Sequence, residues 1–286
     1  MFFLIAGCKV GFFMYFCKQK YNEYQMKKYI LDLQVRSVEH LNDRYVLLKL
    51  TDEKPLPEMC PGQFVEVRVD GSPSTMLRRP ISINFVDRNA NELWLLVAAV
   101  GDGTRRLAQL SAGDTLNCVL PLGNGFTMPK SSDERILLVG GGVGVAPLLY
   151  FGAQMKSVGA VPTFLLGARS AKDLLLLEQF QALGRVFVTT EDGSMGERGF
   201  VTDHSILQQE QFTRISTCGP KPMMMAVARY AAHADIPCEA SLENLMACGL
   251  GACLCCVEKT TDGNLCVCTD GPVFDTRRLM WGNENN

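Results

Sequence analysis

The chain has 286 residues, 47% of them hydrophobic, which is enough for two or three domains with a core each. Its formal net charge of -2 disfavours nucleic acid as the main partner, because phosphate backbones are bound by strongly basic surfaces. The 12 cysteines would suit a secreted disulfide framework, but half of them gather between Cys248 and Cys268, and such clustering favours a metal site.

The N-terminal 25 residues form an extension of uncertain status. They are apolar to about Cys17 but interrupted by Lys9. This stretch is shorter than the ~20 residues that a spanning helix needs, and it lacks the basic start and cleavage pattern of a secretory signal. We expect residues 1–25 to be an upstream extension of the reading frame, with a weak membrane anchor as the alternative, and Met26 to begin the first domain.

Residues 26–128 read as short strands separated by turns. Six β-rich runs cover 29–41, 44–52, 63–69, 81–87, 92–100 and 114–123. Their regular spacing, with glycine, proline and asparagine between them, favours an antiparallel barrel or sandwich. One helix is expected to interrupt this domain, starting near Thr104.

Residues 129–240 alternate between strands and helices. The expected order is a strand, glycine turn and helix over 134–155, strand 161–169, helix 171–183, strand 184–192, strand 214–220 and helix 221–234. This βαβ alternation indicates a parallel sheet with helices on both faces. Residues 241–286 then form a small cysteine-rich module.

The cysteine-rich module matches the C-x4-C-x2-C…C spacing of plant-type 2Fe–2S proteins. The four cysteines at this spacing are Cys248, Cys253, Cys256 and Cys268. Gly249 and Gly251 let the loop curl so that backbone N–H groups can point at the sulfurs. Zinc sites favour cysteine pairs in two separated knuckles, so zinc is an alternative, as are free or disulfide-bonded thiols.

Two further cysteines lie inside the same stretch. Cys255 breaks the spacing, and we expect it to be a packed thiol. Cys266 stands two residues before Cys268 and competes with it as the fourth ligand.

The glycine-rich stretch "LLVGGGVGVAP", residues 137–147, follows a strand and opens a helix. At that position the amides of the helix N-terminus can hold a phosphate group. Val145 stands where the ordinary G-x-G-x-x-G pattern has its last glycine. By itself the stretch therefore indicates either a phosphate loop or a tight turn.

Two stretches of the barrel half can meet an anion. In "LRRPISI", residues 77–83, Arg79 at a strand edge can clamp a pyrophosphate, and Ser82 can donate to a cofactor ring nitrogen. An arginine that simply faces water is the alternative. In "GDGTRRL", residues 101–107, Gly103 and Thr104 sit where a helix would begin, so their amides are free to meet an anion.

The order of these motifs resembles that of the ferredoxin–NADP reductase superfamily. The motifs are R-x-x-S at 79–82, G-x-G-T at 101–104, the glycines at 140–144 and "CGP" at 218–220. With its cysteine-rich tail, the chain resembles the electron transfer subunits of NAD-dependent dihydroorotate dehydrogenases. The resemblance implies an oxidoreductase subunit with an antiparallel FAD-binding β-barrel, a parallel-sheet NAD-binding α/β domain and a C-terminal 2Fe–2S module. Residues 1–25 match nothing in the family.

The resemblance also implies the binding residues. FAD would meet Arg79, Pro80, Ile81, Ser82, Leu96, Val97, Ala98, Gly103 and Thr104. NAD would lie over Gly140, Gly141, Gly142 and Gly144, with its nicotinamide near Cys218, Gly219 and Pro220. The cluster would be held by Cys248, Cys253, Cys256 and Cys268. A buried core thiol is the alternative for Cys218, and Cys255 stands where the family more often has glycine.

In such a family, electrons would pass from a separate FMN-containing catalytic subunit, which oxidises dihydroorotate in pyrimidine (UMP) biosynthesis, through the cluster and FAD to NAD+. A cytoplasmic heterotetramer of two copies of each subunit is implied. Hydride transfer needs orientation rather than acid–base groups, so we expect His40, His204 and His233 to be surface or packing residues.

Two other functions remain open. One is the small FAD/2Fe–2S subunit of an NADH-dependent ferredoxin:NADP oxidoreductase or hydrogenase complex. The other is a non-catalytic metal-binding module that has lost its flavin. The nucleotide is also open. Arg169 and Ser170 could suit a 2′-phosphate, and no acidic residue stands at that strand end to bind a ribose hydroxyl, but the resemblance implies NAD, which we adopt.

Overall fold

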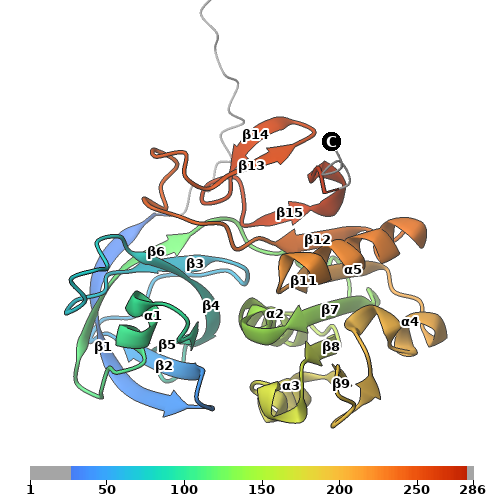
Figure 1. Ribbon diagram of the computed structural model, residues 1–286, viewed down its shortest axis with the longest axis horizontal. Coiled ribbons are helices and arrows are strands. Elements are labelled where there is room, and N and C mark those ends of the chain that lie inside the picture. Colours follow the sequence, from blue (N-terminus) through green and yellow to red (C-terminus); the bar gives the residue numbers. More distant parts are fainter. Residues whose placement is uncertain (1–26, 282–286) are drawn as a thin grey trace, which may run out of the picture.

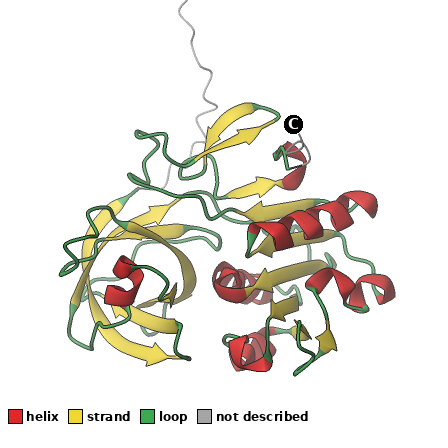
Figure 2. Cartoon of the chain, viewed as in Figure 1, coloured by secondary structure: helices red, strands yellow, loops and turns green. Residues whose placement is uncertain are grey.

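The computed structural model describes residues 27–281, so the expected N-terminal extension lies outside the described residues. Figure 1 shows a barrel beside a parallel sheet, with the cysteine-rich module lying above both. Helices and strands are distinguished in Figure 2. The predicted fold class is confirmed, because a closed barrel precedes a mainly parallel sheet in the chain.

The barrel has six strands in the order β1-β2-β5-β4-β3-β6, and all neighbours are antiparallel. The elements are β1 (Tyr29–His40), β2 (Tyr45–Thr51), β3 (Phe64–Val67), β4 (Arg79–Asp87), β5 (Glu92–Ala98), α1 (Asp102–Leu107) and β6 (Thr115–Leu122). Alternate side chains fill the interior, as Val65 and Val67 do on β3, where each is 0% exposed. The helix expected near Thr104 is α1.

The second sheet has the order β10-β9-β8-β7-β11-β12-β15, and only β15 runs antiparallel to its neighbour. Its strands are β7 (Ile136–Gly141), β8 (Thr163–Ala168), β9 (Arg185–Thr190), β10 (Glu197–Arg198), β11 (Arg214–Cys218), β12 (Cys238–Ser241) and β15 (Val273–Asp275). The chain order reverses between β7 and β11, and dinucleotides bind beyond the carboxyl ends of the strands at such a switch point.

Helices cover both faces of this sheet. They are α2 (Ala146–Ser157), α3 (Leu177–Leu183), α4 (Ile206–Gln209) and α5 (Lys221–His233), with short 3₁₀ helices η1 (Gly142–Val145), η2 (Ala171–Asp173), η3 (Val201–Asp203) and η4 (Thr276–Arg278). Leu138 packs on the α2 and α3 side, whereas Leu137 packs on the α5 side. The strands are therefore apolar on both faces, as expected of a buried parallel sheet.

The predicted continuous helix over 171–183 is wrong in its first half. The Ser170 hydroxyl and the Asp173 carboxylate lie 2.7 Å apart and close the η2 turn. Leu176 then adopts φ 55, a left-handed conformation that the helix cannot include, so α3 starts at Leu177. A local side-chain hydrogen bond competes here with helix formation.

The cysteine-rich module is anchored to both other parts. Its hairpin is formed by β13 (Val257–Thr260) and β14 (Gly263–Cys266), and β15 adds an edge strand to the parallel sheet. One core cluster joins Phe64 of the barrel, Met224 of α5, and Cys256 and Phe274 of the module. The cysteine loop is thus packed at the seam between the two larger parts.

The barrel and the sheet are also fixed to each other directly. Asn84 Nδ2 of β4 donates to the Ala146 carbonyl at 2.9 Å, and the Tyr150 hydroxyl donates to the Met59 carbonyl at 3.0 Å. Because α2 makes both contacts, it holds the glycine turn before it against the barrel. Within residues 27–281, no helix has the length and hydropathy to cross a membrane.

Candidate flavin, nucleotide and iron–sulfur sites

The barrel splits at the predicted flavin residues. The ladder between β4 and β5 runs from Ile83–Leu95 to Asp87–Glu92 and stops there. Beyond it, residues 79–82 pair only with β3, and residues 96–98 pair only with β2. Two strand edges therefore face the opening with backbone groups that need partners. All seven predicted flavin residues of these strands line the split.

The remaining flavin residues lie beside the same opening. A Cβ on Gly103 would stand 3.1 Å from Arg79 Nε and 3.0 Å from Thr75 Cγ2, so the Arg79 side chain crosses directly over Gly103. Arg79 Nη1 donates to the Leu77 carbonyl at 2.8 Å. Thr104 Oγ1 accepts from the amide of Gly101 at 3.0 Å and so fixes the start of α1. The strand edge at Arg79 and the helix start at Gly103 therefore lie against each other, and open backbone groups beside an arginine fit a flavin dinucleotide.

The glycine turn and the "CGP" turn pack against each other. A Cβ on Gly144 would stand 2.3 Å from Gly219 Cα and 2.5 Å from Gly219 N, so only glycine fits at position 144. Gly140 pairs with Cys218 across β7 and β11. The close-approach glycine is therefore Gly144, and Val145 can point into the core, where it is 3% exposed.

Cys218 is wholly buried at the end of β11. Burial raises the pKa of its thiol well above the ordinary value, so the thiol stays protonated. Its Sγ lies 4.0 Å from Oε1 of the exposed Glu243, which follows β12. The structure thus brings Cys218 next to the glycine turn. Its complete burial also agrees with the alternative of a core thiol.

Acidic side chains that the sequence reasoning missed lie near Arg169. The amide of Asp192, after β9, donates to the Arg169 carbonyl at 3.2 Å, and Ser194 Oγ accepts from the Ala171 amide at 2.7 Å. The Ser194 hydroxyl also holds the pKa of Asp192 below its ordinary value. With Asp173 on η2, these loops gather carboxylates where the sequence showed only Arg169 and Ser170. The signal was the "TED" that ends the next strand.

The four cysteines of the 2Fe–2S pattern each accept a backbone hydrogen bond. The contacts are Leu250 N to Cys248 Sγ at 3.3 Å, Cys255 N to Cys253 Sγ at 3.5 Å, Cys268 N to Cys256 Sγ at 3.4 Å and Gly251 N to Cys268 Sγ at 3.2 Å. Amides aimed at sulfur stabilise thiolates and tune iron–sulfur sites. This donor set fits the predicted cluster.

Positive φ angles shape the loop, with Gly249 at 65° and Gly251 at 81°. Burial would raise the pKa of Cys248, but hydrogen bonds from three loop amides outweigh it and lower the pKa to about 6. Burial and the neighbouring Cys256 raise the pKa of Cys268 to about 12. In residues 27–281, no three side chains of His, Cys, Asp or Glu converge as a group that could hold one metal ion.

The two leftover cysteines differ from these four. Among the described residues, no backbone amide donates to the sulfur of Cys255 or Cys266. The Cys266 thiol contacts the thiol of Cys256. Cys255 is exposed rather than packed. The amide of Gly251, inside the ligand loop, points at Cys268, which favours Cys268 over Cys266 as the fourth ligand.

Glu66 of β3 lies between the flavin strand and the cysteine loop. It is 0% exposed, and neither carboxylate oxygen has a hydrogen-bond partner within the described chain. Burial raises its pKa to about 7, with Cys248 adding to the rise and Arg78 opposing it. A Cβ on Gly249 would stand 2.7 Å from Glu66 Cγ, so the loop covers this side chain.

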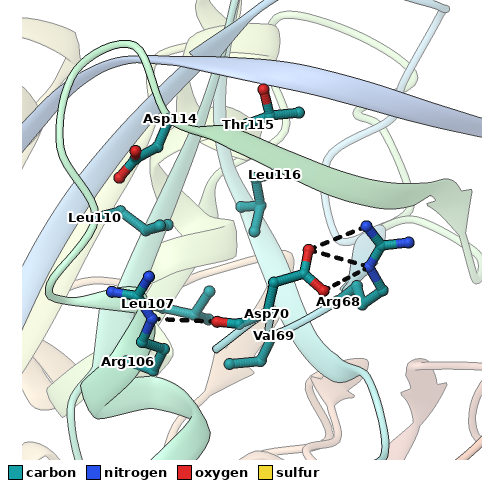
Figure 3. A pocket seen from close by; sticks show the side chains of 9 residues that line it. All are labelled: Arg68, Val69, Asp70, Arg106, Leu107, Leu110, Asp114, Thr115 and Leu116. Carbon is teal, nitrogen blue, oxygen red and sulfur yellow. Dashed lines mark hydrogen bonds and ion pairs between the residues drawn. The ribbon is translucent and has the colours of Figure 1, made fainter. Parts of the chain in front are cut away.

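A cavity of about 110 Å³ lies between α1 and the ends of β3 and β6 (Figure 3). The polar groups on its wall bind one another, because Arg68 Nε is 2.9 Å from the Asp70 carboxylate and Arg106 Nε donates to the Asp70 carbonyl at 3.1 Å. None of the predicted site residues lines it.

His40 and His233 are exposed, and His204 is buried 3.6 Å from Glu197, so the histidines lie outside the sites as expected.

Comparison with known proteins identifies the family. Residues 243–280 match the iron–sulfur cluster binding domain of dihydroorotate dehydrogenase B, and residues 138–229 match the oxidoreductase NAD-binding domain. The chain is 41% identical to the dihydroorotate dehydrogenase B (NAD(+)) electron transfer subunit of Shouchella clausii, over 86% of this chain and 96% of that relative. The chain belongs to this family of electron transfer subunits.

Other dihydroorotate dehydrogenase B electron transfer subunits agree. Those of Bacillus velezensis and Listeria monocytogenes are 38% and 39% identical, over 86% and 85% of this chain and 97% and 96% of the relatives. The predicted family is thereby confirmed, and the chain is an oxidoreductase subunit, as predicted.

Solved structures share the fold. A chain of the NADH-dependent reduced ferredoxin-NADP oxidoreductase superposes with a TM-score of 0.79 and 28% identity, covering 87% of this chain and 90% of that chain. Phthalate dioxygenase reductase superposes with a TM-score of 0.58 and 22% identity, covering 71% of this chain and 64% of that chain. At this identity the likeness supports the fold alone.

Proposed function

We propose that the chain carries electrons from a dihydroorotate-oxidising FMN subunit through a 2Fe–2S cluster and FAD to NAD+. A cluster carries single electrons, a flavin exchanges one or two, and nicotinamide takes a hydride, so together they join one-electron to two-electron chemistry. The observation that carries the proposal is the set of four cysteine sulfurs, each accepting at least one backbone amide hydrogen bond, in a loop packed against the barrel that holds the flavin split.

The barrel would bind FAD along the split. The open backbone edges of β4 and β5 supply hydrogen bonds to a flat polar ring, and Ser82 lies on the half-buried stretch of β4. Arg79, crossing over Gly103, supplies the charge for the pyrophosphate. Leu96 and Val97 are 2% and 1% exposed, so their side chains stay in the core and only their backbone faces the ring.

The sheet would hold NAD at its carboxyl edge. Glycines from residue 140 to 144 let the backbone approach the diphosphate, and Cys218, Gly219 and Pro220 close the neighbouring strand end. This geometry orients the nicotinamide and excludes water without an acid–base group. The carboxylates of Asp173 and Asp192, carried by the loops that meet after Arg169, favour the free 2′-hydroxyl of NAD over the phosphate of NADP.

Comparing NADH and NADPH in a stopped-flow flavin-reduction assay tests this preference. We expect NADH to be favoured at least ~10-fold in kcat/KM. A preference for NADPH would contradict the assignment.

The cysteine loop would dock the catalytic subunit. Large apolar side chains stand out around it, with Leu245 85%, Leu254 63% and Leu250 50% exposed. Met76 and Leu77, in the β3–β4 loop of the barrel, are 95% and 51% exposed. Exposed apolar side chains gathered around a redox centre suit a protein interface, and the family resemblance suggests two copies of each subunit.

Co-expression with the candidate FMN subunit tests the whole proposal. We expect a complex that reduces NAD+ with dihydroorotate and contains FAD, FMN, iron and acid-labile sulfide. The likeness to the ferredoxin-NADP oxidoreductase chain supports the alternative of a subunit in that kind of complex. A complex that turns over ferredoxin but not dihydroorotate would favour this alternative and refute our proposal.

A further inference from the structure

The tip of the β1–β2 hairpin, residues 41–45, reaches from the barrel to the parallel sheet. Asn42 Nδ2 donates to the carbonyl of Lys172 at 3.2 Å, and Lys172 lies in η2, which follows β8. The Tyr45 hydroxyl stands 3.8 Å from the position of a Cβ on Gly142, after β7. Because dinucleotides bind beyond the carboxyl ends of parallel strands, this barrel hairpin stands against the nucleotide site.

The hairpin tip is rigidly built. Asn42 Oδ1 accepts from the amides of Arg44 at 2.9 Å and Tyr45 at 3.2 Å, and the Arg44 carbonyl accepts from the Ala99 amide at 2.8 Å. The Arg44 guanidinium lies 5.8 Å from the centre of the Tyr45 ring, within the range of a cation–π contact. The Tyr45 side chain is therefore held in one place without any ligand.

The two ends of Tyr45 have different surroundings. The ring is half-buried in an apolar cluster to which Val143 and Leu174 also contribute. The hydroxyl has no hydrogen-bond partner anywhere in residues 27–281. A tyrosine whose ring is packed usually finds a partner for its O–H group. The hydroxyl of Tyr45 instead stands beside the turn at Gly142, which has φ +56 and no side chain.

We propose that Tyr45 binds the nucleotide, its hydroxyl donating a hydrogen bond to the diphosphate of NAD held over the β7–α2 turn, with Arg44 adding positive charge beside it. Tyr45 pairs with Ala98 at the edge of the flavin split. It therefore stands between the flavin split and the glycine turn, where the dinucleotide must pass from its nicotinamide to its diphosphate. The inference rests on the proposed nucleotide site and adds a wall to it from the other domain.

Calorimetry with ADP-ribose tests the inference on the full-length chain carrying its flavin and cluster. ADP-ribose has the diphosphate of NAD but cannot accept a hydride. Tyr45→Phe keeps the packed ring and removes only the O–H group. We expect Kd for ADP-ribose, and KM for NADH with ferricyanide as the acceptor, to rise about tenfold with kcat unchanged, as for one lost hydrogen bond to a charged group. Arg44→Gln should raise Kd about threefold, less at high salt.

Tyr29→Phe is the matched control, because Tyr29 begins β1 and pairs with Leu120 of β6, away from the hairpin tip. It should leave Kd unchanged. An unchanged Kd in Tyr45→Phe, with normal FAD content and normal binding by the unaltered chain, would overturn the role of Tyr45. If the unaltered chain itself fails to bind ADP-ribose, the nucleotide site is overturned and the inference falls with it.

Discussion

The flavin split and the cysteine loop achieve their geometry in different ways. The split is bounded by Ile83 and Leu95, both 0% exposed, and its edges are ordinary strands held by the barrel core. The loop is built from turns at positive φ, including Leu254 at φ 59, and Cys253 is exposed. The first site is thus rigid before any cofactor binds, whereas the second depends on bonds between sulfur and iron for its final shape.

The largest effect that this comparison predicts follows from Cys253→Ser. Loss of an exposed ligand should abolish the cluster and lower dihydroorotate-dependent NAD+ reduction at least ~100-fold. NADH oxidation with ferricyanide should stay within about twofold, because the barrel and the sheet each have a core of their own besides the one they share with the loop. Iron analysis, electron paramagnetic resonance and the two assays measure this. Cys255→Ser is the matched control and should retain iron. Equal loss of both activities would show that the two sites are not separable.

The reverse experiment weakens the flavin site. Arg79→Ala should raise Kd for FAD by roughly 30- to 100-fold, since a charged hydrogen-bonding group to the pyrophosphate is lost. The paramagnetic signal of the reduced cluster should persist. Flavin absorbance per chain measures the first and low-temperature spectra the second. Arg36→Ala, on the exposed side of β1, should keep its flavin. Full flavin content in Arg79→Ala would remove this arginine from the site.

Glu66 lies where the two regions meet, and its effect on stability is the smallest of the three. Its folded pKa of about 7 lies above the ordinary 4.5, so the folded protein keeps a proton that the unfolded chain releases. The free energy of unfolding therefore falls as pH rises from about 4.5 through about 7. Glu66→Gln should be more stable than the unaltered chain, by about 1 kcal/mol more at pH 8 than at pH 6.

Thermal unfolding at the two pH values measures this difference. The difference in Tm between Glu66→Gln and the unaltered chain should be a few degrees larger at pH 8 than at pH 6. Glu53→Gln, at an exposed position in a turn, is the control and should show no pH-dependent gap. A gap for Glu66→Gln that is the same at both pH values would mean that the carboxyl does not titrate in this window.

The sequence predicted the regular parts well, for a physical reason. Strands such as β2 and β5 are bounded by turn residues and filled with β-branched and aliphatic side chains, so their limits follow from local preference. The spacing of the cysteines identified the four sulfurs that now accept amides.

Long-range contacts were beyond the same reasoning. Glu66 in "QFVEVRV" has the pattern of a solvent-facing strand residue, and only the packed cysteine loop buries it. Likewise, the need for Gly144 comes from Gly219, and the Asp192 amide meets the Arg169 carbonyl across neighbouring strands. Contacts between residues far apart in the sequence leave no local pattern to read.

The most direct test is to count metal and sulfide in the anaerobically purified chain and in two variants. The account predicts two irons and two acid-labile sulfides per chain, kept in Cys266→Ser and lost in Cys268→Ser, with a paramagnetic signal on reduction. A chain that holds zinc or no metal, or a cluster that survives Cys268→Ser but not Cys266→Ser, would contradict the assignment of the four sulfurs.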